Sequence, residues 1–259
     1  MISAARFFDD PRYLTTVAVE KARATSAREA REVERLVSCR PGALILDAGC
    51  GNGRHSLPLA DAGFRVVGLD RSRPLLAAAQ RAAGGAKWPR FVRGSYTKLP
   101  LASHAFQAVL WLGTSVGYLG DGGDRTALDE FRRVLAPGGR LVIQTLHRDA
   151  LGVGLPDRDE RPLAGGGTLC FSRRFDRARR VMYEEQRLED GGRRDTPRGY
   201  ELRVYGQDEL ARMVEQAGFV IVGRHASLDG QGEPSPVTPL VLVAEVPDRP
   251  RSDGSGGRE

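Results

Sequence analysis

The chain has 259 residues, of which 41% are hydrophobic and 28% are charged, and this composition supports a packed core and excludes a disordered chain. Thirty-nine Lys and Arg residues against 33 Asp and Glu residues give a net charge of +6. Only three of the basic residues are Lys, a bias that fits a GC-rich coding sequence as well as a polyanion-binding surface. The positive charge alone therefore does not indicate a nucleic-acid partner.

Several classes of protein are excluded by what the chain lacks. Its apolar runs stay below the ~18 residues of a membrane span, and its first residues contain no apolar stretch of a secretory signal, so we expect a cytoplasmic protein with no membrane partner. The cysteines Cys39, Cys50 and Cys170 are odd in number and far apart, which argues against disulfides and cysteine zinc sites. The four His residues lack metal-binding spacings, so no metal site is predicted.

The first part of the chain alternates helix-like and strand-like segments. The first forty residues are expected to be helical, because Val33, Leu36 and Val37 form an apolar stripe at helical spacing before Pro41. Short apolar runs then alternate with helical segments bounded by Gly or Pro, which is typical of βαβ units and a mostly parallel sheet. The expected strands are residues 43–46, 64–70, 90–94, 105–112 and 139–146, and the expected helices are residues 54–63, 72–83 and 124–135.

The pattern changes after residue 148. Residues 151–167 are expected to form a loop, and a turn at residues 190–192 indicates an antiparallel β segment around it. The strands of that segment are expected at residues 168–175, 179–189 and 200–205. A helix, two strands and a disordered tail are expected to follow at residues 207–218, 219–228, 239–246 and 247–259.

A glycine-rich loop directly follows the first expected strand and opens a helix. Its sequence is Asp47-Ala48-Gly49-Cys50-Gly51-Asn52-Gly53. Glycines at such a corner allow positive φ and a close approach of the backbone to a ligand. Asp70 ends the next strand, where a carboxylate can accept hydrogen bonds from both ribose hydroxyls. Together these features predict a nucleoside ligand.

The loop also discriminates between nucleosides. A dinucleotide fingerprint needs a third glycine where this chain has Arg54, and the charge of Asp47 would repel a pyrophosphate. The same charge suits a ligand with an ammonium and a sulfonium group, an attraction of up to ~4 kcal/mol at ~4 Å. The loop therefore favours S-adenosylmethionine over NAD.

These residues carry a family resemblance. The segments 47–72, DAGCGNGRHSLPLADAGFRVVGLDRS, and 106–149, which includes RVLAPGG, resemble class I S-adenosylmethionine-dependent methyltransferases, and the likeness extends over residues 25–148. It implies a Rossmann-like, seven-stranded, mostly parallel sheet with helices on both faces, plus an inserted antiparallel β segment after the fifth strand. The implied organisation is a helical lid (1–40), a cofactor-binding core (41–148), inserted strands over the acceptor pocket (149–206), a C-terminal helix with two core strands (207–246) and the tail (247–259).

The resemblance also implies a cofactor site. Asp70 would hold the ribose, the glycine loop would face the methionine and ribose moieties, and Ser95 stands where an Asp near the adenine is common. The aromatic residues Phe7, Phe8 and Tyr13 are expected either to shield the sulfonium or to pin a terminal helix to the core. The expected cofactor residues are Tyr13, Asp47, Gly49, Cys50, Gly51, Gly53, Asp70, Arg71, Ser95, Tyr96 and Trp111.

A general base is needed only if the acceptor must lose a proton. His147 follows the fifth strand and, with an ordinary pKa of ~6.5, is the first candidate, although a solvated histidine is the alternative. Tyr118 is the second, with core packing as its alternative, and His225 is weaker. The run 172–180 is expected to be a solvated hairpin or to bind an acidic substrate.

The inserted strands bear on substrate and assembly. In residues 181–189, alternation puts Met182, Glu184, Gln186 and Leu188 on one face and Tyr183, Glu185 and Arg187 on the other. Neither face is purely apolar, so one of the two is expected to line a polar cavity or a subunit contact, and a homodimer is kept as an alternative. The predicted activity is methylation of an O or N centre of a small molecule, with S-adenosylhomocysteine as product. A non-catalytic S-adenosylmethionine-binding protein is one alternative. A nucleic-acid methyltransferase is the other, but Trp111-Leu112-Gly113-Thr114 replaces the motif that holds a flipped base, and none of the cysteines follows the fourth strand as a nucleophile.

Overall fold

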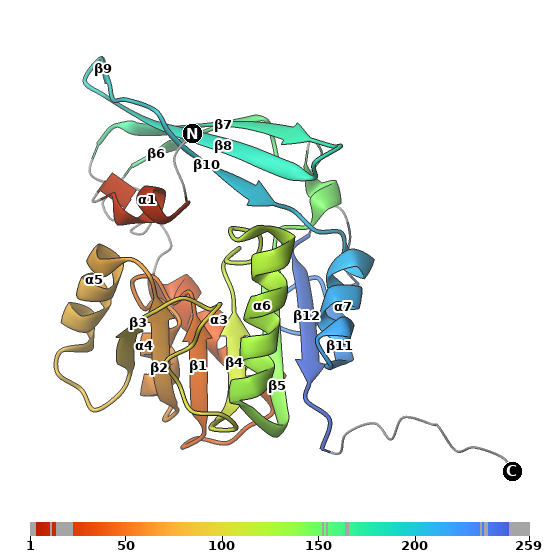
Figure 1. Ribbon diagram of the computed structural model, residues 1–259. Helices are drawn as coiled ribbons and strands as arrows, with labels where there is room; N and C mark the ends of the chain where they lie inside the picture. Colours follow the sequence, from red (N-terminus) through yellow and green to blue (C-terminus); the bar gives the residue numbers. More distant parts are fainter. Residues whose placement is uncertain are drawn as a thin grey trace, which may run out of the picture.

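The computed structural model describes residues 4–10, 12–13, 23–151, 153, 155–163, 166–233, 235 and 238–248. A twisted sheet with helices on both faces forms the larger part, and a second, antiparallel sheet lies over one end of it (Figure 1). The expected tail residues 249–259 and residues 14–22 of the expected helical lid lie outside the described residues. Among the helices that are described, none combines the length and the apolar character needed to cross a bilayer.

The main sheet has seven strands in the order β11-β12-β5-β4-β1-β2-β3. Strands β1 to β5 pair in parallel, and β12 runs antiparallel to both β5 and β11, which confirms the mostly parallel sheet. The strand order reverses between β1 and β4, so their carboxyl ends form a crevice of the kind where ligands bind. The strands are β1 (Leu44–Ala48), β2 (Arg65–Asp70), β3 (Arg90–Arg93), β4 (Phe106–Trp111), β5 (Leu135–Thr145), β11 (Val220–His225) and β12 (Leu240–Glu245).

Helices cover both faces of this sheet because its central strands are apolar on both sides. In β1, Leu46 packs with α6 and α7, whereas Ile45 packs with α3 and α4. The expected stripe of α3 is buried against the second face, with Val33 fully inaccessible. The helices of the core are α3 (Arg23–Val37), α4 (Ser56–Asp61), α5 (Arg73–Ala83), α6 (Gly120–Val134) and α7 (Gln207–Gln216).

The inserted segment forms the second sheet, with β10-β8-β7-β6 as its strand order and β9 paired to β8. Its pairs are all antiparallel, as expected. One expectation was wrong: residues 158–162 form strand β6 where a loop was predicted. These side chains are mostly exposed, so edge pairing with β7 rather than apolar alternation makes them a strand. The strands are β6 (Arg158–Pro162), β7 (Thr168–Asp176), β8 (Val181–Asp190), β9 (Arg193–Arg194) and β10 (Arg198–Arg203).

Two short helices connect the two sheets. Helix α1 (Ala4–Asp9) contacts both β10 and α5, so the start of the chain lies between the antiparallel sheet and the core. The short helix η1 (Arg148–Ala150) follows β5 and leads into the inserted segment. Both connections lie at the carboxyl end of the parallel strands, where the predicted site residues gather.

Candidate functional site

A cavity of about 550 Å³ lies between the two sheets. Its floor consists of the glycine loop after β1, the end of β2 and the loop after β4, and its roof consists of residues from β7, β8 and β10. Aromatic residues of α1 and Tyr13 line one side. A volume of this size, with both apolar and polar walls, is typical of a small-molecule site.

The glycines of the floor are required by backbone geometry. A Cβ on Gly49 would lie 2.8 Å from Ser115 Oγ and 3.0 Å from the Tyr96 hydroxyl, so a larger residue would collide with the loop after β4. A Cβ on Gly53 would lie 3.0 Å from Phe91, which places Gly53 against the core rather than on the cavity. The left-handed φ angles are 83° at Gly49, 56° at Gly51 and 80° at Gly53.

Asp70 lies on the cavity floor with its carboxylate held by two backbone groups. Its Oδ2 accepts a hydrogen bond from the amide of Gly51 at 2.9 Å, and its Oδ1 accepts one from the amide of Ser72 at 2.8 Å. Burial raises the pKa of Asp70, and these backbone N–H groups oppose that rise. Each oxygen keeps acceptor capacity, so the carboxylate can receive two further hydrogen bonds from a diol.

The structure places four of the expected cofactor residues away from the cavity, and Gly53, which lies against the core, is one of them. The Asp47 carboxylate is buried and accepts a hydrogen bond from Ser56 Oγ at 2.6 Å. Ser95 pairs with the Thr97 hydroxyl at 2.9 Å, and Trp111 is fully buried in the core. The expected cofactor residues that line the cavity are Tyr13, Gly49, Cys50, Gly51, Asp70, Arg71 and Tyr96.

An aromatic cluster joins α1 and Tyr13 to the roof of the cavity. The ring centroids of Phe8 and Tyr13 are 5.0 Å apart, those of Phe8 and Tyr118 are 5.1 Å apart, and those of Phe7 and Tyr200 are 4.8 Å apart. All five line the cavity, so Phe7, Phe8 and Tyr13 both face the site and hold α1 against the antiparallel sheet. Burial raises the pKa of Tyr13 to about 12 and raises that of Tyr118 well above its usual value, so both phenols are protonated at neutral pH.

A buried carboxylate organises the roof. Glu184 Oε2 accepts a hydrogen bond from Arg173 Nε at 2.8 Å, and its Oε1 accepts from Gln186 Nε2 and from the Tyr200 hydroxyl, both at 2.8 Å. Gln186 Oε1 is buried and meets no hydrogen-bond partner within the described part of the chain. Met182, Glu184 and Gln186, which the alternation puts on one face, are all buried, whereas Leu188 of the same face is half-buried. In the run 172–180, which was expected to be a solvated hairpin, Arg173 is the exception with 8% exposure, whereas residues 177–180 are exposed.

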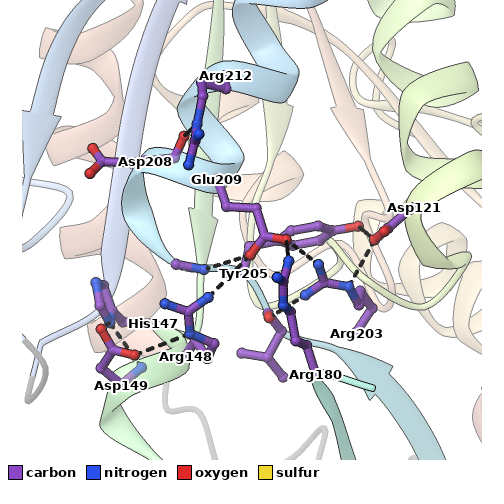
Figure 2. Close-up of polar contacts among 12 residues, drawn as sticks. Asp121, His147, Arg148, Asp149, Arg180, Arg203, Tyr205, Asp208, Glu209 and Arg212 are labelled. Atoms are coloured by element: carbon purple, nitrogen blue, oxygen red, sulfur yellow. Dashed lines mark hydrogen bonds and ion pairs between the residues drawn. The ribbon is translucent and has the colours of Figure 1, made fainter. Parts of the chain in front are cut away.

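His147 lies outside the cavity wall. Its Nδ1 accepts a hydrogen bond from the amide of Asp149 at 3.1 Å and so caps η1, and the residue as a whole is 6% exposed. Figure 2 shows His147 beside Arg148 and Asp149, next to a charged cluster that ties the two sheets together. Its neighbour Leu146 lines the cavity instead. Both residues follow the end of β5 at Thr145, and the hydrogen bond from the Asp149 amide holds the His147 ring at η1.

That charged cluster, which we call the hinge cluster, contains Asp121, Arg148, Arg180, Arg203 and Glu209 (Figure 2). Glu209 Oε2 lies 3.3 Å from Arg148 Nη1 and Glu209 Oε1 lies 2.5 Å from Arg180 Nη1, while Arg203 pairs with both Glu209 and Asp121. These contacts join the start of α7 and of α6 to the antiparallel sheet.

Beneath the hinge cluster, the Tyr205 hydroxyl donates to Asp124 Oδ2 at 2.7 Å. Asp124 is fully buried, and burial raises its pKa to about 7. The Asp124 carboxyl therefore changes its protonation state near neutral pH, and it lies where the two sheets are connected.

Sequence reasoning missed a second polar group on the floor. Arg54 and His55 both line the cavity, and both contact Glu29 of α3. His55 Nε2 lies 2.9 Å from Glu29 Oε2, and Arg54 Nη1 donates to the same oxygen. In the sequence Arg54 stood out only as a break in a dinucleotide fingerprint. The one available signal was its position at the end of the glycine loop.

The amino-acid sequence is similar to a known protein family and to several methyltransferases. A family model described as "Methyltransferase domain" matches residues 45–139. The demethylmenaquinone methyltransferase of Renibacterium salmoninarum is 36% identical over 150 residues, which cover 57% of this chain and 60% of that protein. A malonyl-[acyl-carrier protein] O-methyltransferase of Pseudescherichia vulneris is 37% identical over 112 residues, 43% of this chain and 42% of that protein. The chain thus matches less than two thirds of the length of these relatives.

Solved structures are similar over nearly the whole chain. The CcbJ methyltransferase of Streptomyces caelestis has a TM-score of 0.79 at 23% identity, over 93% of this chain and 98% of that one. The S-adenosylmethionine-bound CalS10, an amino pentose methyltransferase of Micromonospora echinaspora, has a TM-score of 0.65 at 24% identity, over 91% and 96%. The TM-scores show a shared fold over more than nine tenths of this chain, and at identities below 25% the similarity shows the fold alone.

Proposed function

From the premise that the chain carries a methyltransferase domain and has the class I S-adenosylmethionine-dependent methyltransferase fold, we propose that it transfers a methyl group from S-adenosylmethionine to an O or N centre of a small molecule. The observation that carries the proposal is the cavity of about 550 Å³, whose floor suits a nucleoside and whose roof closes over it. The methyl acceptor must fit into this cavity beside S-adenosylmethionine, and the volume of the cavity limits the acceptor to a small molecule.

The residues of the floor fit S-adenosylmethionine. The Asp70 carboxylate, held by two amides, would accept both ribose hydroxyls, and Gly49 leaves the cradle that a Cβ would fill. Tyr13 and Tyr96 present aromatic walls, which favour a cationic sulfonium by a cation–π interaction of ~0.5–2 kcal/mol. When bound, the cofactor supplies an electrophilic methyl group.

The chain's own contribution to the reaction is alignment and exclusion of water. Methyl transfer is an in-line displacement, so a catalyst gains most from holding both reactants at the right distance in a closed site. Phe8, Tyr118 and Tyr200 close the cavity on the acceptor side. Because the pKa of Tyr118 is raised by burial, its phenol would donate a hydrogen bond to the acceptor rather than remove a proton.

The roof indicates how the acceptor would be held. The Glu184 carboxylate and the unpartnered Gln186 Oε1 face the cavity from the antiparallel sheet. Both are hydrogen-bond acceptors, so a substrate with hydroxyl or amino groups would be complementary. The relatives named above differ from one another in the acceptors that their names state. A homodimer and a cytoplasmic location stay predictions from the sequence.

The proposal is tested by labelling. The purified protein is incubated with S-adenosylmethionine carrying a radioactive methyl group, together with either a small-molecule extract or total RNA. We expect label in the small-molecule fraction and S-adenosylhomocysteine as the second product. Label confined to RNA would contradict the substrate class. Tight binding of NAD instead of S-adenosylhomocysteine in calorimetry would contradict the proposed cofactor.

A further inference from the structure

Few side chains of the cavity could serve a proton-transfer step. Among the described residues of the cavity wall, only Asp70, His55 and Glu184 can take up a proton at neutral pH, because the phenols and the thiol of that wall already carry theirs. Asp70 would hold the ribose, and His55 Nε2 is tied to Glu29 on the floor at 2.9 Å. Glu184 is the one that lies in the roof, on the side where the acceptor would be held, and it is only 6% exposed.

The Glu184 carboxylate is surrounded by donors, and one of them is a hydroxyl. Its Oε2 accepts from Arg173 Nε, and its Oε1 accepts from Gln186 Nε2 and from the Tyr200 hydroxyl, each at 2.8 Å. Tyr200 lines the cavity, and because its own proton points to Glu184, the lone pairs of its oxygen are left as acceptors. An O–H or N–H group that donates to Tyr200 is therefore connected to Glu184 through two hydrogen bonds in series.

The phenol of Tyr200 can pass a proton on but cannot store one. Burial raises the pKa of Tyr200 well above its usual value, so the phenolate does not form. A proton that reaches the phenol oxygen must therefore be matched by the departure of the phenol's own proton in the same step. The ring centroid of Tyr118 lies 5.3 Å from that of Tyr200, so an acceptor that receives a hydrogen bond from Tyr118 would lie beside the Tyr200 hydroxyl.

We propose that Tyr200 and Glu184 form the proton route of the methyl transfer, in which Tyr200 takes the proton of the acceptor and passes its own proton to Glu184. This inference rests on the proposed function, since it assigns residues to one step of the same reaction. As the O or N atom of the acceptor bonds to the methyl group, its O–H or N–H bond breaks and the proton binds the phenol oxygen. The Tyr200 O–H bond breaks in the same step, and that proton binds Glu184 Oε1.

Charges and electrons balance in this step. The electron pair of the bond between sulfur and the methyl group stays on sulfur, so the positive charge of the sulfonium and the negative charge of the carboxylate disappear together. A protonated Glu184 leaves Arg173, a buried guanidinium with 8% exposure, without its anion, which is strongly unfavourable. Arg173 therefore favours return of the proton through Tyr200 to water once the product has left, and this restores the carboxylate for the next turnover.

The test measures the chemical step in a single turnover. The protein, in excess over S-adenosylmethionine with a radioactive methyl group, is mixed with the small-molecule extract, and transfer of label is followed in time. Tyr200→Phe keeps the ring but removes the hydroxyl, so it should slow the transfer by ~10²–10⁴-fold, the usual contribution of proton transfer by a positioned group. Its affinity for S-adenosylhomocysteine, measured by calorimetry, should stay near the wild-type value. Wild-type transfer should be slower in heavy water than in water, and most of this difference should disappear in Tyr200→Phe.

A second set of variants separates the route from packing. Glu184→Gln keeps an acceptor for Tyr200 but cannot take up a proton, and Arg173→Met in the same chain removes the charge that would be left unpaired. This double variant should slow the transfer by about the same factor as Tyr200→Phe. Adding Tyr200→Phe to it should cause no further loss, because both changes interrupt one route, whereas separate structural effects would multiply.

The matched control is Gln186→Leu, which removes the other neutral donor to the same oxygen of Glu184. It should slow the transfer by ~10-fold or less, as for the loss of one hydrogen bond. A Tyr200→Phe rate no lower than that of Gln186→Leu, or losses that multiply in the combined variant, would overturn the route while leaving the proposed function intact. A wild-type protein that transfers no label to the extract would overturn the proposed function and the route with it.

Discussion

The floor and the roof of the cavity are built in different ways. The floor is set by backbone geometry within one stretch of chain: left-handed glycines and amide groups that hold Asp70. The roof is set by side chains from three strands that are brought together by register. Arg173 and Tyr200 each pair directly across from Glu184, one from β7 and the other from β10.

This difference suits the two substrates that we propose. A cofactor that is always the same can be held by a floor in which backbone amides fix the position of the Asp70 carboxylate. An acceptor that differs between relatives can be held by side chains, which change without disturbing the sheet beneath them. We therefore expect changes to the floor to alter cofactor affinity, and changes to the roof to alter stability and acceptor use.

The largest expected effect comes from the roof. Glu184→Ala would leave the buried Arg173 guanidinium without its carboxylate, since the only other acceptor that it contacts among the described residues is the Pro156 carbonyl, at 3.1 Å. Removing one partner of a buried ion pair costs about 3–5 kcal/mol. Chemical denaturation should show this loss, while the folded variant should bind S-adenosylhomocysteine with wild-type affinity.

A matched variant tests the physical reason. Replacing both partners, as Arg173→Met with Glu184→Met, removes the uncompensated charge and should recover most of the lost stability. If the double variant is as unstable as Glu184→Ala, the ion pair is not the cause. If either variant loses cofactor affinity, the floor and the roof are coupled rather than independent.

The connection between floor and roof should respond to pH. Burial raises the pKa of Asp124 to about 7, above the ordinary value of 3.8, so the folded protein holds this proton more tightly than the unfolded chain does. The resulting stability is complete below pH ~4 and is lost as the pH rises through ~7, up to about 4 kcal/mol in total. The free energy of unfolding, measured between pH 4 and 8, should fall accordingly.

The control is Asp124→Asn, whose amide oxygen can still accept the hydrogen bond from Tyr205. This variant has no proton to lose, so its stability relative to the wild type should increase between pH 5 and 8. An identical pH dependence in the two proteins would mean that Asp124 is not the titrating group.

The contrast between floor and roof also explains what could be predicted from the sequence. Glycine spacing and the acid after the second strand are local signals, so the sequence alone could single out Gly49, Gly51 and Asp70, which line the same cavity in the structure. Glu184 and Arg173 meet only because β7 and β8 pair in one register, which no local pattern reveals. Period-2 alternation groups Glu184 with Met182 and Gln186 on one face of β8, but it does not say which face of the strand is buried.

A smaller effect is expected on the floor. Asp70→Ala should weaken the binding of S-adenosylhomocysteine by about 1.5–3 kcal/mol, because two hydrogen bonds to a charged group are lost. Stability should change less, since the amides of Gly51 and Ser72 lie at the cavity and can be solvated. Calorimetry on the variant measures the first effect and thermal unfolding the second. Unchanged affinity would remove Asp70 from the cofactor site.

The smallest effect is expected for His147, which belongs to neither wall. His147→Ala should leave turnover within ~3-fold of the wild type, because a base must lie within reach of the proton that it removes and this ring caps η1 instead. Loss of that cap should cost about 0.5–1 kcal/mol of stability. The assay is the pH–rate profile, measured with the acceptor found by labelling.

Tyr118→Phe is the matched comparison, because it removes a hydroxyl from the cavity wall without changing the packing of the ring. Losing one hydrogen bond to the acceptor should lower kcat/KM by ~10-fold. A wild-type profile that rises near pH 6–7 and becomes flat in His147→Ala would restore His147 as the base. Such a result would require η1 to unwind when the acceptor binds, because the Nδ1 that now accepts from Asp149 would have to turn toward the cavity.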